Sequence, residues 1–472
     1  MLGEEVLYQT VGELAPQIKA RKISPAELTE SYLQRIRRYA DKLNAIESVT
    51  AEQARREARA AEAEIAAGHW RGPLHGIPYL AKDLLATSGA RTTWGATPLK
   101  NQTFSYDATV VKRLHDAGAV LLGKSAMIEF AGGLGYRFCD SSVSGPCRTP
   151  WALERWAGGS SSGSGAAVAA GLCAFAIGTE TWGSILCPSA FNGITGLRPT
   201  YGRVSRYGAM VCAWTFDKIG PMARSAADCR TVLATIAGPD PNDPSAVDEP
   251  LGLDAAPRAP GRIRAALIPL DWSKYGDREV KAAFDAAVAD LKALGVRFSD
   301  ARLPDVPASE VAGALITAEA LSTFESFFRT GAVKQLVDPY AQHQVEINAA
   351  MSGADVVKAW RIRRVLQDKM TDFFANFDVI VSPNFMTVAP PLDKDLFETL
   401  PYPDPVGAVG NACGLPAIAL PCGFGPKHLP ASVQIMGAPF EEAVLCDLGE
   451  AYQKRTSFHR ERPPLSDVVG SP

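Results

Sequence analysis

The sequence has few of the residues that mark metal, secreted or membrane proteins. Its 472 residues include six scattered histidines, so no metal-ligand cluster is expected. The nine cysteines contain no C-x-x-C pair, which favours reduced, mostly buried thiols in a cytoplasmic protein. The first ten residues lack the basic and apolar runs of a secretory signal. The longest small and apolar run, Ala166–Ile177, is too short to cross a bilayer.

The chain also lacks a surplus of charge of either sign. Lys and Arg together number 48 and Asp and Glu together 51, which gives a formal net charge of −3. The chain therefore lacks the basic surplus that would favour a nucleic-acid or membrane partner, and we expect neither. Hydrophobic residues make up 47% and charged residues 21%, as in an ordinary folded protein with a large core.

Helical and strand-like segments alternate along most of the chain. This alternation predicts an α/β protein built around a largely buried sheet. Ser24-Pro25-Ala26-Glu27 is a helix-start pattern. Helices are expected at 26–40, 51–67, 108–117, 163–172, 277–294 and 354–376. Strands are expected at Ile77–Ala81, Ala119–Leu122, Ala174–Ile177, Val379–Val381, Ala417–Leu420 and Ser432–Met436.

The middle of the chain suggests an addition to one domain. Residues 238–262 are rich in Pro, Asp and Ala, which predicts a surface loop. The helices expected after this loop have amphipathic patterns. We predict a single domain over residues 1–472, with a helical elaboration at roughly 240–376.

Two glycine-rich turns that contain serine are the most informative feature. The first reads GGSSSGSG from Gly158, and the second reads GTETWGSI from Gly178. Glycine lets backbone N–H groups approach a ligand closely, and a serine among them can act as a nucleophile. A phosphate-binding loop is one interpretation, but the first turn contains no G-K-[ST] and no G-x-G-x-x-G.

A second interpretation is the nucleophile elbow of a Ser-His-Asp esterase. Residues 159–163 match G-x-S-x-G with Ser161 as the nucleophile. That motif requires a strand directly before it, and residues 148–155 do not look like one. It also requires a later histidine, and the candidates His343, His428 and His459 have no distinguishing context.

A third interpretation joins both turns with Lys82, and here the sequence resembles the amidase signature family. The family pattern is G-G-S-S-G-G-S, an Ala-rich helix, G-T-D-T-G-G-S-I-R-x-P and G-L-[KR]-P-T. This chain has GGSSSGSGAAVAAG, GTETWGSILCP and GLRPT in the same order. GPLHGIPYLAKDL at 72–84 and LLGKSAMIEFAGG at 121–133 also have family counterparts, so the resemblance covers nearly the whole chain. It implies the amidase signature fold, with a mostly parallel mixed twisted sheet covered by helices on both faces.

The resemblance implies a Ser–Ser–Lys triad that needs no metal or cofactor. Ser184 would be the nucleophile, Ser160 the bridging serine after a cis peptide bond, and Lys82 the base. Lysine acts as a base only when neutral, and burial favours the neutral form. Lys82 follows an apolar strand-like run that can carry it into the interior. From the residues alone, an ion pair between Lys82 and Asp83 remains the competing interpretation.

Three positions near the nucleophile depart from the family pattern. Glu180 replaces aspartate, Trp182 replaces glycine, and Leu186 replaces arginine. The expected oxyanion hole consists of the backbone N–H groups of Thr181, Trp182, Gly183 and Ser184. Without the arginine, Glu180 must find another partner.

The resemblance implies a small-molecule amide substrate and a monomer or homodimer. The apolar replacements favour an apolar or aryl amide, or a carbamate, with ester hydrolysis as a side activity. A glutaminase-type subunit of a tRNA-dependent amidotransferase is the alternative. The expected substrate-binding residues are Met127, Gly132, Gly133, Trp182, Leu186, Met210 and Trp214.

Overall fold

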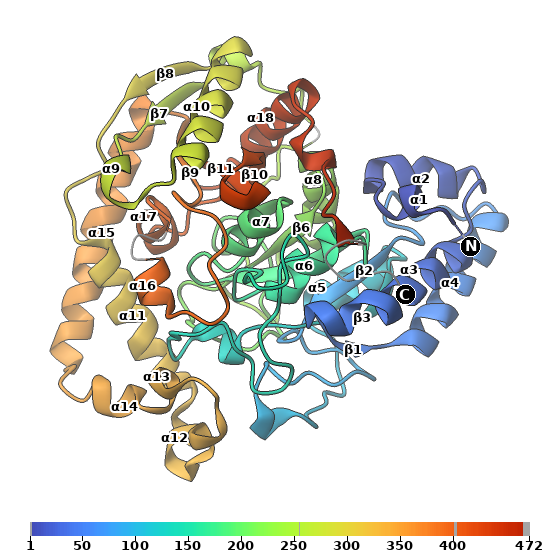
Figure 1. Ribbon diagram of the computed structural model, residues 1–472, viewed down its shortest axis with the longest axis horizontal. Coiled ribbons are helices and arrows are strands. Elements are labelled where there is room, and N and C mark those ends of the chain that lie inside the picture. Colours follow the sequence, from blue (N-terminus) through green and yellow to red (C-terminus); the bar gives the residue numbers. More distant parts are fainter. Residues whose placement is uncertain (1, 254, 401–403, 466–472) are drawn as a thin grey trace.

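One mixed sheet of eleven strands runs through the part of the chain that the computed structural model describes, residues 2–253, 255–400 and 404–465 (Figure 1). Its strand order is β1-β3-β2-β4-β6-β5-β10-β11-β9-β7-β8. All six strands expected from apolar runs are present. The bounds are β1 (Ile46–Val49), β2 (Pro78–Lys82), β3 (Val120–Ser125), β4 (Phe175–Glu180), β5 (Thr195–Arg198), β6 (Lys218–Ala223), β7 (Arg264–Leu267), β8 (Arg297–Asp300), β9 (Val379–Pro383), β10 (Ala417–Phe424) and β11 (Pro430–Gly437).

The sheet is mixed, as expected, but it is not mostly parallel. Among the ten strand pairings described, four are parallel and six antiparallel. Five of the antiparallel pairs lie in the centre, where β4, β6, β5, β10, β11 and β9 follow one another, and the sixth joins β1 to β3 at one edge. The two strands that bring antiparallel pairing into the centre were not predicted, because β5 has only four residues and includes a glycine, and β6 contains both glycine and proline.

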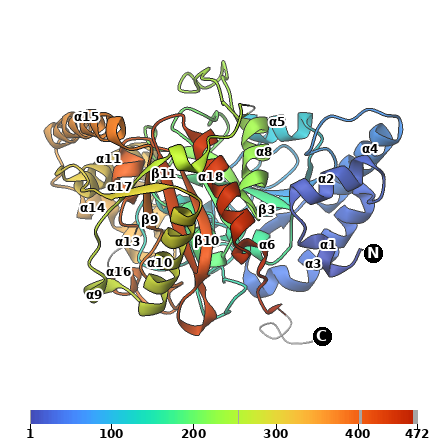
Figure 2. The ribbon, with the colours of Figure 1, turned by 90° about the horizontal axis from the view of Figure 1, so that it is seen from above.

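Helices cover both faces of the sheet, as expected. Gly196 of β5 pairs with Ala419 of β10, and a side chain at Gly196 would meet Ser189 of the helix α7. Ile418 and Leu420, which alternate with Ala419, lie near Gly449 of α18 on the other face. Figure 2 shows α10 and α18 over β10 and β11, and α8 lies beside α18 and packs on β5 and β6.

The expected helices all form, and local sequence explains their ends. The Ser24 side chain accepts a hydrogen bond from the Glu27 N–H, and Pro25 occupies the first turn of α3. The helices are α1 (Glu4–Leu7), α2 (Val11–Lys19), α3 (Pro25–Leu43), α4 (Ala51–Ala66), α5 (Thr109–Asp116), α6 (Ser162–Ala169), α7 (Leu186–Asn192), α8 (Ala226–Ile236), α9 (Trp272–Tyr275), α10 (Arg278–Ala293), α11 (Ala308–Thr323), α12 (Glu325–Thr330), α13 (Pro339–Gln342), α14 (Gln344–Ile347), α15 (Gly353–Asn376), α16 (Leu396–Thr399), α17 (Gly407–Ala412) and α18 (Glu442–Arg455).

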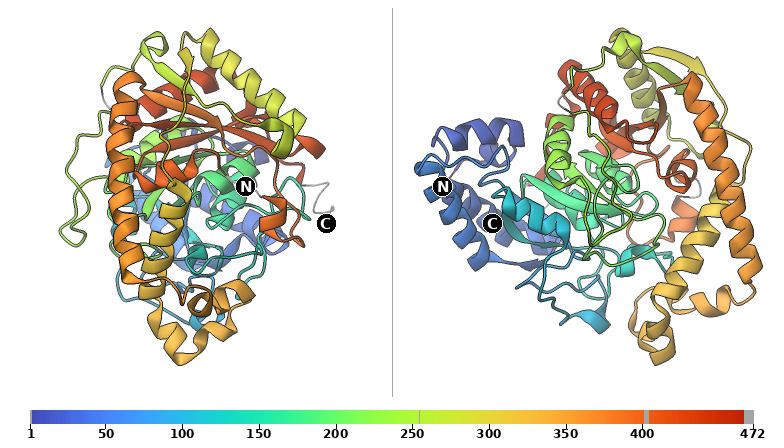
Figure 3. Two further views of the ribbon diagram at one scale, coloured as in Figure 1. Left: turned by 90° about the vertical axis from the view of Figure 1, so that its left-hand side faces the viewer. Right: turned by 180° about the vertical axis from the view of Figure 1, so that it is seen from behind.

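The segment 240–376 contributes strands as well as helices. Its strands β7 and β8 extend one end of the sheet, and β7 pairs in parallel with β9. Its helices α11 and α15 pack together at the side of the molecule opposite the N-terminal helices (Figure 3). The continuous sheet supports the single-domain organisation that we propose.

The cysteines agree with the expectation of reduced, mostly buried thiols. All nine cysteines are free, and eight are buried, with Cys413 partly buried. Within the described ranges, no helix is both long enough and apolar enough to span a membrane.

Candidate active site

Strand β2 carries Lys82 into the interior, next to the first serine turn. The Lys82 side chain is fully buried. Its Nζ donates a hydrogen bond to Ser160 Oγ at 2.8 Å and another to Thr179 Oγ1 at 2.9 Å. Lys82 is distant in the sequence from Ser160 and Thr179, so the fold brings together the lysine and the bridging serine of the expected triad.

The two serine turns lie against each other, as the third interpretation requires. The Ser161 N–H donates to the Ser184 carbonyl at 3.3 Å, and the Gly159–Ser160 peptide bond is cis, as expected. The surroundings of Ser161 do not favour the esterase interpretation. Its Oγ exchanges hydrogen bonds with the backbone of Thr179 and, within the described residues, with no histidine.

Burial sets the protonation of Lys82. It lowers the pKa of Lys82 to about 7, although Cys212, Asp217 and Glu180 nearby act in the opposite direction. Asp83 does not pair with Lys82. Its nearest cation is the buried Lys124, at 3.8 Å, so the competing ion-pair interpretation is wrong.

We expect kcat/KM for an amide substrate to rise with pH through about pH 7. Lys82 can accept a proton only when neutral, and its neutral fraction falls tenfold for each pH unit below its pKa. A profile measured from about pH 5 to about pH 9 tests this. A flat profile across pH 7 would show that Lys82 is not the base.

Ser184 lies on the turn between β4 and α7. Ser184 is 7% exposed, and its hydroxyl makes no hydrogen bond within the described residues. Proton transfer from Ser184 to Ser160 therefore remains a prediction. The backbone N–H groups of residues 181–184 likewise find no acceptor in the described part of the chain. Gly183 has φ +83, and the space beside its Cα is open. These amides are free to bind an oxyanion.

The structure shows how the residues around Ser184 accommodate the three departures from the family pattern. Trp182 is not among the residues with positive φ, so its backbone does not adopt the left-handed conformation that favours glycine. Glu180 Oε1 accepts a hydrogen bond from Arg198 at 2.7 Å, and its Oε2 accepts the N–H groups of Ile185 and Leu186. Although burial alone raises the pKa of Glu180, Arg198 and Lys218 bring it below its ordinary value. Arg198 thus supplies the partner for Glu180 that an arginine at position 186 was expected to supply.

Only part of the expected substrate-binding set lines a cavity. Met210 and Trp214 line a cavity of about 180 Å³ that also contacts Thr179 and Thr181. Trp182 is partly exposed. Leu186 and Met127 are buried in the core, so they offer no surface to a ligand. A side chain at Gly132 would meet Tyr136, and one at Gly133 would meet Cys212.

Sequence reasoning missed several polar residues of this site. Thr179 binds Lys82, and Arg206, Asp217 and Lys218 line the same cavity. Thr179 lies inside the quoted GTETWGS motif, and Asp217 begins the stretch DKIGPMARS, which also has a family counterpart, so position within a motif was the available signal. Arg206 lies in the stretch YGRVSRYGAM, which also has a family counterpart, so it carried the same signal.

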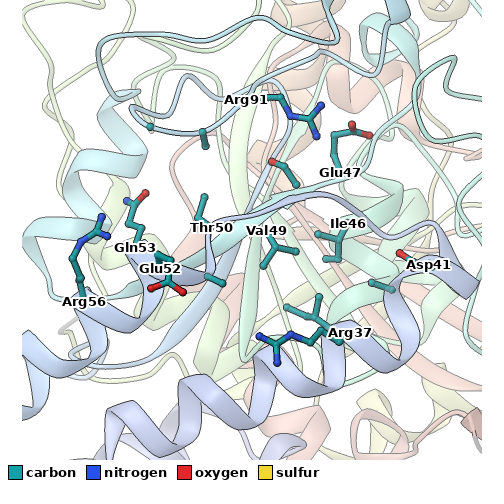
Figure 4. Close-up of a pocket in the computed structure, with 16 residues that line it drawn as sticks. Arg37, Asp41, Ile46, Glu47, Val49, Thr50, Glu52, Gln53, Arg56 and Arg91 are labelled. Carbon is teal, nitrogen blue, oxygen red and sulfur yellow. The ribbon is translucent and has the colours of Figure 1, made fainter. Parts of the chain in front are cut away.

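A second cavity lies away from the triad, along the edge strand β1. Its volume is about 910 Å³, and its walls come from α3, β1, α4 and residues 89–91. Figure 4 shows the side chains of Arg37, Glu47, Arg56 and Arg91 around it. None of the expected catalytic or substrate-binding residues lines this cavity.

Comparison with known proteins agrees with this arrangement. The family model Amidase matches residues 27–446. The chain is 36% identical to a glutamyl-tRNA(Gln) amidotransferase subunit of Moorella thermoacetica, over 98% of this chain and 99% of that protein.

Solved structures show the same relationship. The peptide amidase of Stenotrophomonas maltophilia is 31% identical, with a TM-score of 0.84 over 97% of this chain and 98% of that one. The corresponding glutamyl-tRNA(Gln) amidotransferase subunit of Thermotoga maritima is 27% identical, with a TM-score of 0.81 over 98% of each chain. The chain therefore belongs to the Amidase family of hydrolases that act on carbon–nitrogen bonds.

Proposed function

We propose that the chain hydrolyses amides with Ser184 as the nucleophile, Ser160 as the proton relay and Lys82 as the base. The observation that carries this proposal is the buried hydrogen bond of 2.8 Å between Lys82 Nζ and Ser160 Oγ. A lysine with a pKa of about 7 is half neutral near neutral pH, which a general base requires.

The geometry supports a two-step reaction. Ser160 gives its proton to neutral Lys82 and takes the proton of Ser184, whose Oγ attacks the acyl carbon. Backbone N–H groups of residues 181–184 hold the oxyanion. The proton on Lys82 returns through Ser160 to the leaving amine, which departs and leaves an acyl group on Ser184. Water then attacks the ester, passes its proton along the same route, and releases the acid and free Ser184.

Similarity over the whole chain favours a glutaminase-type substrate. The relatives named as amidotransferase subunits match this chain from end to end, at 36% and 37% identity in two examples. This favours the glutaminase-type alternative over a free-standing aryl amidase. In this interpretation the chain releases ammonia from glutamine and works with partner proteins, in place of a monomer or homodimer.

A second substrate class has its own support. Trp182 lies in the oxyanion turn, and Met210 and Trp214 line the adjoining cavity, with Trp214 55% exposed. These side chains fit an apolar or aryl amide, or an aryl carbamate, better than glutamine. A carbamate would be attacked in the same way and lose carbon dioxide later. Leu186 no longer supports this class, because it is buried.

A hydrolysis panel tests the function and separates the two substrate classes. Glutamine, an aliphatic primary amide, an anilide and an aryl carbamate are each incubated with the protein, and products are read by mass. We expect cleavage of at least one amide and an acyl adduct on the peptide that contains Ser184. Both should disappear in Ser184→Ala. Cleavage that survives in Ser184→Ala would refute the proposed nucleophile.

A further inference from the structure

Asp217 joins the oxyanion turn to the loop that lines the active-site cavity. It directly precedes β6, and its Oδ1 accepts a hydrogen bond from Thr181 Oγ1 at 2.6 Å. The same carboxylate accepts the N–H groups of Cys212, at 2.8 Å, and Ala213, at 3.1 Å. Cys212 and Trp214 belong to the loop that forms one wall of the cavity. One carboxylate therefore binds both sides of the site.

Thr181 is held at a second point, from the same strand. Lys218 Nζ lies 3.5 Å from the Thr181 carbonyl oxygen and also donates to the Phe216 carbonyl. In a trans peptide the carbonyl and the following N–H point in opposite directions. A Thr181 carbonyl held toward Lys218 therefore directs the Trp182 N–H away from Lys218. Trp182 is the residue at which this chain departs from the glycine of the family pattern.

We infer that Asp217 is a positioning residue that fixes the oxyanion turn through the Thr181 hydroxyl. The inference rests on the proposed function, because it concerns the amides that would bind the oxyanion. Within the described residues, Asp217 makes no hydrogen bond to a member of the triad. It acts by holding the Thr181 hydroxyl while Lys218 holds the carbonyl of the same residue. Loss of the hydroxyl contact lets the turn rotate, so the amides bind the transition state less well while substrate binding is retained.

Asp217→Asn and Thr181→Val test this inference with an amide that the panel shows to be cleaved. Each variant should lower kcat roughly tenfold or more with little change in KM, because misaligned oxyanion donors weaken transition-state binding. Thr181→Ser, which keeps the hydroxyl, should recover most of the loss. The double variant should be no slower than the slower single one, because both substitutions act on the same hydrogen bond between Thr181 and Asp217.

The control is Asp240→Asn. Asp240 also accepts hydrogen bonds from two hydroxyls, those of Thr109 and Ser205, but it does not line the cavity. It should leave kcat within about twofold. Additive losses in the double variant, a raised KM in Asp217→Asn, or equal losses in Asp240→Asn would each overturn the inference. Failure of the proposed function has a different signature, namely amide cleavage that persists in Ser184→Ala.

Discussion

Lys82→Met is expected to lower kcat at least about a thousandfold while leaving the protein folded. Lys82 is the only base that forms a hydrogen bond with the Ser160 hydroxyl in the described part of the chain, and methionine cannot accept a proton. The pH dependence of the free energy of unfolding should also change. Because burial lowers the pKa of Lys82 from 10.5 to about 7, the unfolded state binds the extra proton between these values.

The sign of this linkage can be measured. At pH 7 and below, the shift corresponds to about 5 kcal/mol that opposes folding of the wild type, and this opposition fades as the pH rises toward 10.5. The variant lacks this cost but leaves Ser160 and Thr179 without their lysine partner. We therefore expect its free energy of unfolding to match or exceed that of the wild type at pH 7. As the pH rises, the free energy of unfolding of the wild type should increase relative to that of the variant. Urea unfolding at several pH values gives the comparison.

Lys124→Met is the matched control, since Lys124 is equally buried. Its Nζ donates to the Leu85 carbonyl and to Thr92, and it lies beside the Asp83 carboxylate. Its removal leaves the buried Asp83 carboxylate without its lysine partner, which costs about 3–5 kcal/mol. The control should thus lose stability and keep kcat in the folded fraction. The base assignment is refuted if Lys82→Met keeps kcat within tenfold, or if both variants lose activity and stability alike.

The sequence predicted the strands and site residues that its own motifs mark. Apolar runs located β2 and β4, and the resemblance assigned Lys82 and Ser160, which the structure places in hydrogen-bond contact. Both turns were predicted to meet, and the bond from the Ser161 N–H to the Ser184 carbonyl joins them. Such features are local in the sequence or belong to a motif whose order is visible.

The features that the sequence could not predict depend on which segments become neighbours. The partner of Glu180 is Arg198, which lies on β5, and nothing near position 180 indicates it. Leu186 looked like part of an apolar substrate site because it follows the nucleophile, yet α7 turns it into the core. The antiparallel centre of the sheet was hidden for the same reason, since β5 and β6 become strands through pairing and not through an apolar run of their own.

Glu180→Gln is expected to reduce both stability and turnover. It leaves the buried guanidinium of Arg198 with the Leu415 carbonyl and the Met436 sulfur as its remaining partners, and an uncompensated buried charge costs about 3–5 kcal/mol. Adding Arg198→Met should restore much of the stability, because no unpaired charge remains. It should not restore kcat. The carboxylate also holds the N–H groups of Ile185 and Leu186, directly after the nucleophile.

The buried pair of Arg203 and Glu442 separates these two effects. Its carboxylate is also fully buried, lies 3.1 Å from its arginine, and accepts the Thr200 N–H. Glu442→Gln should therefore lose a similar amount of stability, measured by urea unfolding, while kcat per folded molecule stays within about twofold. Equal losses of kcat in Glu180→Gln and Glu442→Gln would mean that turnover follows stability alone. A kcat that falls only at position 180 would instead show that the Glu180 carboxylate, held by Arg198, orients the turn that carries Ser184.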